Sequence, residues 1–187
     1  SFGGTQLVDS ISISSRAIKN AKVLIIGDSK TDYFAASYKN TYGRILDKYL
    51  TTEINAGPGD RTPEAVLRLP EIKYLSPRQV LIQTFRNDSA SGMTMSQAMA
   101  NLKIITDSLS SWGIKYYFIP FYETSVDYSA WNNYIFSHYP NNYIDTWTLF
   151  KSGFLQDGVH PTSAGHDTLA KIILNSFKLD GGGNRYD

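Results

Sequence analysis

Near the start of the chain an apolar run stops abruptly at a polar turn. The run from Val23 to Ile26 is Val-Leu-Ile-Ile, and Gly27, Asp28 and Ser29 follow it directly. A short continuous run of aliphatic residues predicts a strand buried on both faces, as in parallel sheets. Ser29 would then lie at the carboxyl end of that strand. Because ligands of open α/β sheets bind at this end, Ser29 is the first candidate functional residue.

Strand-like and helical patterns alternate along the rest of the chain. The alternation predicts a parallel sheet with helices on both faces. Right-handed crossovers favour a three-layer, α/β/α, flavodoxin-like fold with a five-stranded parallel sheet of order 2-1-3-4-5. We expect Gly113 to end one helix and Ser163 to cap the last. The further strands are predicted over 51–54, 79–85, 115–120 and 142–146, and the helices over 42–50, 63–69, 95–112, 127–138 and 163–177.

Composition excludes several classes of function. The 187 residues suit one domain, and 18 Lys plus Arg nearly balance 17 Asp plus Glu. Such a balance gives no sign of a nucleic-acid or membrane-surface partner. The chain has no cysteine, so neither disulfides nor thiolate chemistry are available. No apolar stretch approaches the roughly 18 residues that span a bilayer.

The two ends of the chain differ in composition from its centre. Residues 1–20 are rich in serine and predict a linker or an edge strand. Residues 21–179 are expected to form the folded domain, and residues 180–187, which include three consecutive glycines, a flexible tail. These ends, and a start at Ser1, favour a monomeric module of a larger protein. We expect it to be extracellular or periplasmic, and bacterial or phage-borne.

Only three histidines are available as a base near neutral pH. His160 stands in a turn three residues after Asp157, which can therefore reach back to the imidazole ring. A carboxylate bound to Nδ1 fixes the tautomer whose Nε2 can take a proton from serine. Taken alone, such a pair is better explained by a polar turn before a helix. His138 and His166 are expected to be structural.

Two more polar positions follow the second and third predicted strands. Gly59 lies in the loop of residues 55–60, and Asn87 follows the strand over 79–85. A glycine lets its backbone N–H approach a ligand closely, and an asparagine amide donates without carrying charge. Both groups suit the negative oxygen that forms during acyl transfer.

Four blocks of this sequence resemble those of the SGNH (GDSL-type) hydrolases, in the family's order. The resemblance spans residues 22–177 and implies a flavodoxin-like fold with serine esterase chemistry that needs no metal or other cofactor. It implies Ser29 as nucleophile, His160 as general base and Asp157 as the acid that orients His160. The implied oxyanion hole comprises the backbone N–H groups of Ser29 and Gly59 and the amide of Asn87, with Asp28 and Asp88 as supporting residues. The blocks are Gly27-Asp28-Ser29, Gly59-Asp60, Asn87-Asp88 and Asp157-Gly158-Val159-His160-Pro161.

The sequence departs from the family pattern at three places. Phe85 stands where a small residue is usual, and it would either narrow the acyl pocket or shift Asn87. The second block is one residue shorter than usual, so Gly57 is an alternative to Gly59 as oxyanion donor. Lys30 stands where the original motif has leucine. Like Arg86, it could contact an anionic or hydroxylated substrate or be solvated.

The function favoured by these residues is removal of a small acyl group, acetyl in particular, from a carbohydrate through an acyl-enzyme. The protein has a candidate serine nucleophile with a histidine and an aspartate. It lacks the long apolar lid with which a lipase buries a fatty acyl group. Two alternatives remain: a lysophospholipase, thioesterase or arylesterase of the same family, and a non-catalytic glycan-binding module. Aromatic residues in the later loops, which could stack on sugars or fill the core, are Tyr122, Tyr128, Trp131 and Trp147.

Overall fold

The structure, a computed structural model, describes residues 23–31, 40–83, 86–120, 127–147 and 152–179. The expected linker over 1–20, the expected tail over 180–187, Phe85 and Tyr122 lie outside these ranges.

A parallel sheet forms the centre of the described chain. Its four strands are β1 (Val23–Gly27), β2 (Thr52–Ala56), β3 (Gln79–Gln83) and β4 (Lys115–Phe118), in the order β2-β1-β3-β4. In the register, Ile25 of β1 pairs with Ile54 on one side and with Leu81 on the other. β1 is therefore an inner strand, and the strand order agrees with the first four positions of the predicted order.

The predicted fifth strand is not formed by the described residues 142–146. Pro140–Asn142 makes a 3-10 turn, η2, and a single parallel bridge then joins Tyr143 to Phe118. Ile144 N–H donates to the Phe118 carbonyl at 3.0 Å, but Thr146 N–H bonds back to the Ile144 carbonyl at 2.8 Å. The segment thus lies beside β4, where the predicted order places it, and turns away after one pairing.

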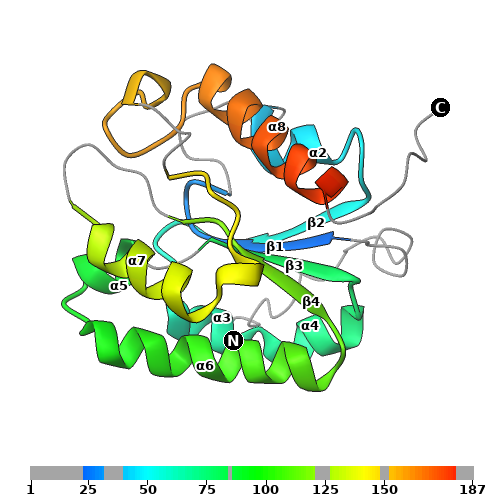
Figure 1. The fold of residues 1–187 in the computed structure, drawn as a ribbon, viewed down its shortest axis with the longest axis vertical. Helices are drawn as coiled ribbons and strands as arrows, with labels where there is room; N and C mark the ends of the chain where they lie inside the picture. The colour runs from blue at the N-terminus through cyan, green and yellow to red at the C-terminus, as the bar shows by residue number, and fades with distance from the viewer. Residues whose placement is uncertain (1–22, 32–39, 84–85, 121–126, 148–151, 180–187) are drawn as a thin grey trace, which may run out of the picture.

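Helices cover both faces of this sheet (Figure 1). On one face lie α2 (Tyr42–Leu46) and α8 (Ser163–Leu179). On the other lie α3 (Thr62–Leu67), α4 (Leu69–Leu75), α6 (Met95–Ser111) and α7 (Ser129–His138). Alternate residues of β1 supply both cores, because Ile25 packs in the cluster with α2 and α8 and Ile26 in the cluster with α6. None of the helices in the described part is long and apolar enough to cross a membrane.

The ends of the helices follow local sequence signals, with one correction. Gly113 has a φ of 69°, and Ile114 N–H donates to the Leu109 carbonyl at 2.9 Å, so Gly113 ends α6 as predicted. The N-cap of α8 is Thr162, whose Oγ1 accepts the Gly165 N–H at 3.1 Å. The prediction of Ser163 was wrong by one residue, since Ser163 already belongs to the first helical turn.

Gly27 ends β1 at a position that has no room for a side chain. A Cβ there would lie 1.9 Å from Thr31 Oγ1 and 3.0 Å from the Gln83 carbonyl oxygen. The close approach of Thr31 therefore requires glycine at this point of the turn that carries Ser29.

Replacing this glycine tests that requirement. Gly27→Ala is expected to lower the free energy of unfolding by about 1–3 kcal/mol through overpacking. The control is Gly153→Ala, because a Cβ there meets nothing within 4 Å. Urea denaturation of both variants measures the difference. Equal stabilities of the two variants would contradict the packing described for Gly27.

Candidate active site

A chain of hydrogen bonds links a serine, a histidine and an aspartate that lie far apart in the sequence. Ser29 Oγ lies 3.1 Å from His160 Nε2, and His160 Nδ1 lies 2.6 Å from Asp157 Oδ2. Ser29 follows β1, whereas Asp157 and His160 belong to the turn before α8. The fold therefore brings together the three residues that the sequence analysis selected.

The turn around Asp157 holds the carboxylate in place. Its Oδ1 accepts the backbone N–H of Val159 at 2.9 Å and that of His160 at 2.7 Å. Desolvation acts to raise the pKa of Asp157, but the hydrogen bonds from His160 and Val159 outweigh it and lower the pKa to about 2. The carboxylate is ionised near neutral pH, so Nδ1 of His160 carries the proton and Nε2 presents a lone pair to Ser29.

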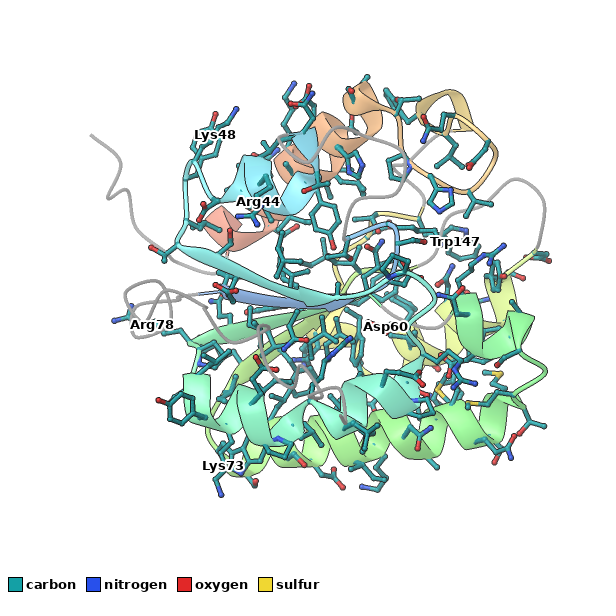
Figure 2. The ribbon with its side chains drawn as sticks, turned by 180° about the vertical axis from the view of Figure 1, so that it is seen from behind. Arg44, Lys48, Asp60, Lys73, Arg78 and Trp147 are labelled. Atoms are coloured by element: carbon teal, nitrogen blue, oxygen red, sulfur yellow. The ribbon has the colours of Figure 1, made fainter. Side chains whose placement is uncertain are left out.

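The carboxyl ends of the three neighbouring strands meet beside Ser29. Asn87 follows β3, and its side-chain N–H donates to the carbonyl of Asp60, which follows β2, at 2.9 Å. The same nitrogen lies 3.5 Å from Asp28 Oδ2, which follows β1. Figure 2 shows Asp60 and Trp147 towards the opposite end of the sheet from Arg78, which precedes β3.

The two glycines between which the sequence left a choice differ in their surroundings. Gly59 has a φ of 84°, and a Cβ there would meet nothing within 4 Å. A Cβ at Gly57 would lie 3.0 Å from the Asp60 carboxylate, and Gly57 also accepts the Asp60 N–H through its carbonyl at 3.0 Å. Gly59 thus borders open space that a ligand can enter, whereas Gly57 packs within its own loop.

Asn87 lies in a short helix, α5 (Arg86–Ala90), that the sequence analysis did not predict. The neighbouring Asp88 is fully buried and accepts the backbone N–H of Thr62 at 3.1 Å and its hydroxyl at 2.8 Å. Burial raises the pKa of Asp88, and the bonds from Thr62 partly offset this effect. Asp88 therefore ties α5, which holds Asn87, to the start of α3.

Behind Ser29 lies a buried polar network that the sequence analysis did not predict. Gln83 Oε1 accepts from the hydroxyl of Thr31 at 2.9 Å and from that of Tyr42 at 3.0 Å, and these two hydroxyl oxygens lie 2.7 Å apart. The backbone N–H of Tyr42 donates to His166 Nδ1 at 3.2 Å. The network thereby joins the turn of Ser29 to α8, which follows the turn of His160.

His166 Nδ1 accepts a hydrogen bond from the backbone N–H of Tyr42 in this network, so this nitrogen carries no proton. His166 is 4% exposed, and burial lowers its pKa from 6.5 to about 4. The unfolded chain takes up a proton at a higher pH than the folded one, so acidification from pH 6.5 towards 4 favours unfolding.

A titration of stability tests this role of His166. Over that pH range the free energy of unfolding of the wild type should fall by on the order of 3 kcal/mol more than that of His166→Asn. The amide oxygen of the asparagine accepts the same N–H but does not titrate. Chemical denaturation at several pH values measures the loss. Parallel curves for the two proteins would show that His166 is not held neutral.

The later aromatic residues that the structure describes divide between core and surface. Tyr128 is 6% exposed, and Trp131 packs against the same apolar cluster as α6. Both therefore fill the core, which was one of the two interpretations of these aromatic residues. Trp147 is half-buried.

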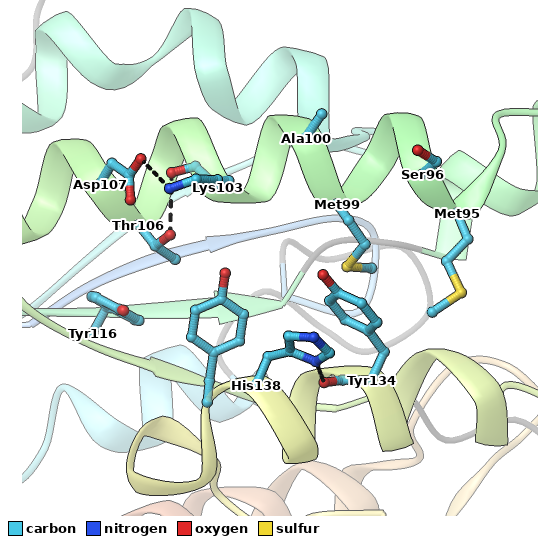
Figure 3. A pocket seen from close by; sticks show the side chains of 11 residues that line it. Met95, Ser96, Met99, Ala100, Lys103, Thr106, Asp107, Tyr116, Tyr134 and His138 are labelled. Atoms are coloured by element: carbon cyan, nitrogen blue, oxygen red, sulfur yellow. Dashed lines mark hydrogen bonds and ion pairs between the residues drawn. The ribbon is translucent and has the colours of Figure 1, made fainter.

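A hollow of about 800 Å³ lies between α6 and α7 (Figure 3), and none of its lining residues belongs to the Ser29 chain of hydrogen bonds. In its wall the rings of Tyr134 and His138 stack with centroids 3.8 Å apart, and His138 Nδ1 donates to the Tyr134 carbonyl at 2.8 Å. His138 thus belongs to the end of α7. Within the described ranges no three His, Asp or Glu side chains are arranged to hold a metal ion.

Comparison with known proteins supports the assignment of the fold. A scan against protein-family models finds no match, and a search of curated proteins finds no similar sequence. Among solved structures, a GDSL-like lipase from Bacteroides thetaiotaomicron has a TM-score of 0.74 and 17% identity, with 88% of this chain and 90% of that chain covered. The psychrotrophic esterase EstA from Pseudoalteromonas sp., in a structure inhibited by monoethylphosphonate, has a TM-score of 0.71 and 18% identity over 84% and 96%. A carbohydrate esterase family 3 protein from Talaromyces cellulolyticus has a TM-score of 0.66 and 14% identity over 88% and 100%.

These similarities and the strand order define the class of the fold. It is the α/β/α fold of the SGNH (GDSL-type) acylhydrolases, lipases and esterases. The fold by itself does not determine an activity, so the function is argued from the site.

Proposed function

We propose that this protein is a serine ester hydrolase of the SGNH type. The observation that carries the proposal is the unbroken contact from Ser29 Oγ to His160 Nε2 at 3.1 Å and from His160 Nδ1 to Asp157 at 2.6 Å. A serine hydroxyl needs an adjacent base to become a nucleophile, and the base needs a group that orients it. The three side chains meet both needs.

In the first half of the reaction, Ser29 Oγ attacks the carbonyl carbon of the ester while its proton passes to His160 Nε2. The ionised Asp157 stabilises the imidazolium that forms. The negative charge moves to the carbonyl oxygen, for which the backbone N–H groups of Ser29 and Gly59 and the Asn87 amide are the proposed donors. When the tetrahedral intermediate collapses, His160 returns the proton to the departing alcohol oxygen.

In the second half, water replaces the alcohol. His160 Nε2 takes a proton from the water as its oxygen attacks the acyl-Ser29 ester, and the same oxyanion donors stabilise the second intermediate. Its collapse releases the carboxylic acid and returns the proton to Ser29 Oγ. The cycle consumes one water molecule and needs no group beyond those of the chain.

For the substrate we propose a small acyl ester, acetyl in particular, on a carbohydrate. One support is the similarity to the Talaromyces cellulolyticus carbohydrate esterase, at a TM-score of 0.66, but a GDSL-like lipase is more similar in fold, at 0.74. The same-chemistry alternative is therefore a lysophospholipase, thioesterase or arylesterase. The short distance between Ser29 and His160 favours either esterase over a module that only binds glycans.

The nucleophile and the residue that orients its base are tested with p-nitrophenyl acetate. Ser29→Ala is expected to abolish turnover, and Asp157→Asn to reduce kcat by on the order of 10³–10⁴-fold, because the imidazole is then neither oriented nor stabilised. His138→Ala is the control, since His138 is exposed and outside the site. Turnover that survives in Ser29→Ala would rule out the proposed mechanism.

The oxyanion donor is tested separately. Asn87→Ala should lower kcat by on the order of 100- to 1,000-fold and leave KM nearly unchanged, because the donor acts on charge that develops in the transition state. Asn142→Ala is the control, since Asn142 donates to the Tyr116 carbonyl at 2.8 Å, outside the hydrogen bonds described around Ser29 and Asn87. A loss that falls on KM alone would assign Asn87 to ground-state binding.

The acyl group is tested with esters of increasing chain length. The proposal predicts a higher kcat/KM for p-nitrophenyl acetate than for the butyrate and octanoate esters, and release of acetate from acetylated oligosaccharides. A preference for octanoate would favour the lysophospholipase or thioesterase alternative while leaving the serine mechanism intact.

A further inference from the structure

Directly after the nucleophile the chain buries a lysine. Lys30 is only 1% exposed, so it is not the solvated side chain that the sequence allowed. A lysine is almost never buried this completely without a partner, because removing the ammonium group from water is costly. Its burial beside Ser29 therefore calls for an explanation in terms of nearby charge.

One partner of the Lys30 ammonium is the residue on the other side of Ser29. Lys30 Nζ lies 4.0 Å from Asp28 Oδ2, and Asp28 is also 1% exposed. Asp28 Oδ1 accepts the backbone N–H of Lys30 at 2.9 Å. The backbone bond fixes one carboxylate oxygen, and the other faces the ammonium.

The oxygen that faces Lys30 also faces the candidate oxyanion donor. Asn87 Nδ2 donates to the Asp60 carbonyl at 2.9 Å and makes a longer hydrogen bond of 3.5 Å to Asp28 Oδ2. A carboxylate without a counter-charge at this place would draw the second N–H of Asn87 into a shorter and stronger hydrogen bond. It would also repel the negative charge that grows on the carbonyl oxygen of a bound ester, and the low polarity of a buried site strengthens both effects.

We propose that Lys30 is a positioning residue that balances the charge of Asp28 next to the oxyanion hole. Its ammonium holds the Asp28 carboxylate in place and offsets its charge, so that the bond from Asn87 to Asp28 stays long and weak and its N–H can turn to the oxyanion. This role rests on the proposed esterase function and extends it to a residue of the nucleophile turn that does not touch the substrate.

Three variants test the role through kinetics on p-nitrophenyl acetate. Lys30→Met keeps the length of the side chain and removes the charge, and it is expected to lower kcat by about 10- to 100-fold with little change in KM. Lys30→Arg keeps the charge and should retain more activity than Lys30→Met. The double variant Asp28→Asn with Lys30→Met removes both charges and should recover part of the lost kcat. Lys103→Met is the matched control, because Lys103 lies at the surface with its side chain 71% exposed.

A merely structural role would give a different pattern. It predicts that thermal stability and kcat fall together and that removing Asp28 as well adds to the damage. Recovery in the double variant supports the proposal, and a double variant no more active than Lys30→Met overturns it. If Lys30→Met does not fold, the double variant decides, since the proposal expects it to fold and to turn over ester.

The outcomes also separate this inference from the proposed function. If the wild type is active and sensitive to Ser29→Ala while Lys30→Met equals the wild type, only the role of Lys30 is wrong. If the wild type and Ser29→Ala are equally inactive on every ester, the esterase proposal is wrong, and the catalytic role of Lys30 falls with it.

Discussion

In a parallel sheet the carboxyl ends of all strands lie at the same edge, and the candidate active site of this protein depends on that constraint. β1 ends at Gly27, β2 at Ala56 and β3 at Gln83, and in the register Gly27 pairs with both of the other two residues. The three segments that follow these strands therefore leave the sheet side by side. Polar residues that stand up to 59 positions apart in the sequence, such as Asp28 and Asn87, then come within 3.5 Å.

Such an edge has to accommodate buried polar groups, and each of them needs a partner. Asp88 is satisfied by Thr62, and Thr31 by Gln83 and Tyr42. The same bonds fix the turn that carries Ser29 and the short helix α5 that carries Asn87. Rigid support of this kind is what electrostatic catalysis requires, because donors that are already oriented need no rearrangement when charge develops.

The sequence predicted the parts of the structure that depend on local patterns. The apolar run of β1 and the three-residue spacing of Asp157 and His160 act over a few positions, so the strand and the turn could be derived directly. Gly113 is a similar case, since a helix end requires a left-handed residue there.

Features that depend on distant partners could not be derived in the same way. The segment over 142–146 has the composition of a strand, but only Tyr143 forms a bridge, to Phe118. Asn87 lies in a helix too short to show a periodic pattern. The burial of Lys30 follows from its surroundings in the fold, including Asp28, and a lysine in a sequence is by default a surface residue.

The central claim is that Ser29 is a nucleophile activated by His160. Its most direct test is labelling with an activated ethylphosphonate ester, whose phosphorus is attacked by a serine oxygen with loss of the leaving group, followed by mass spectrometry of the digested protein. The account predicts one adduct, on the peptide that contains Ser29, and almost none when His160 is replaced by alanine. Labelling at another residue, or unchanged labelling without His160, would contradict it.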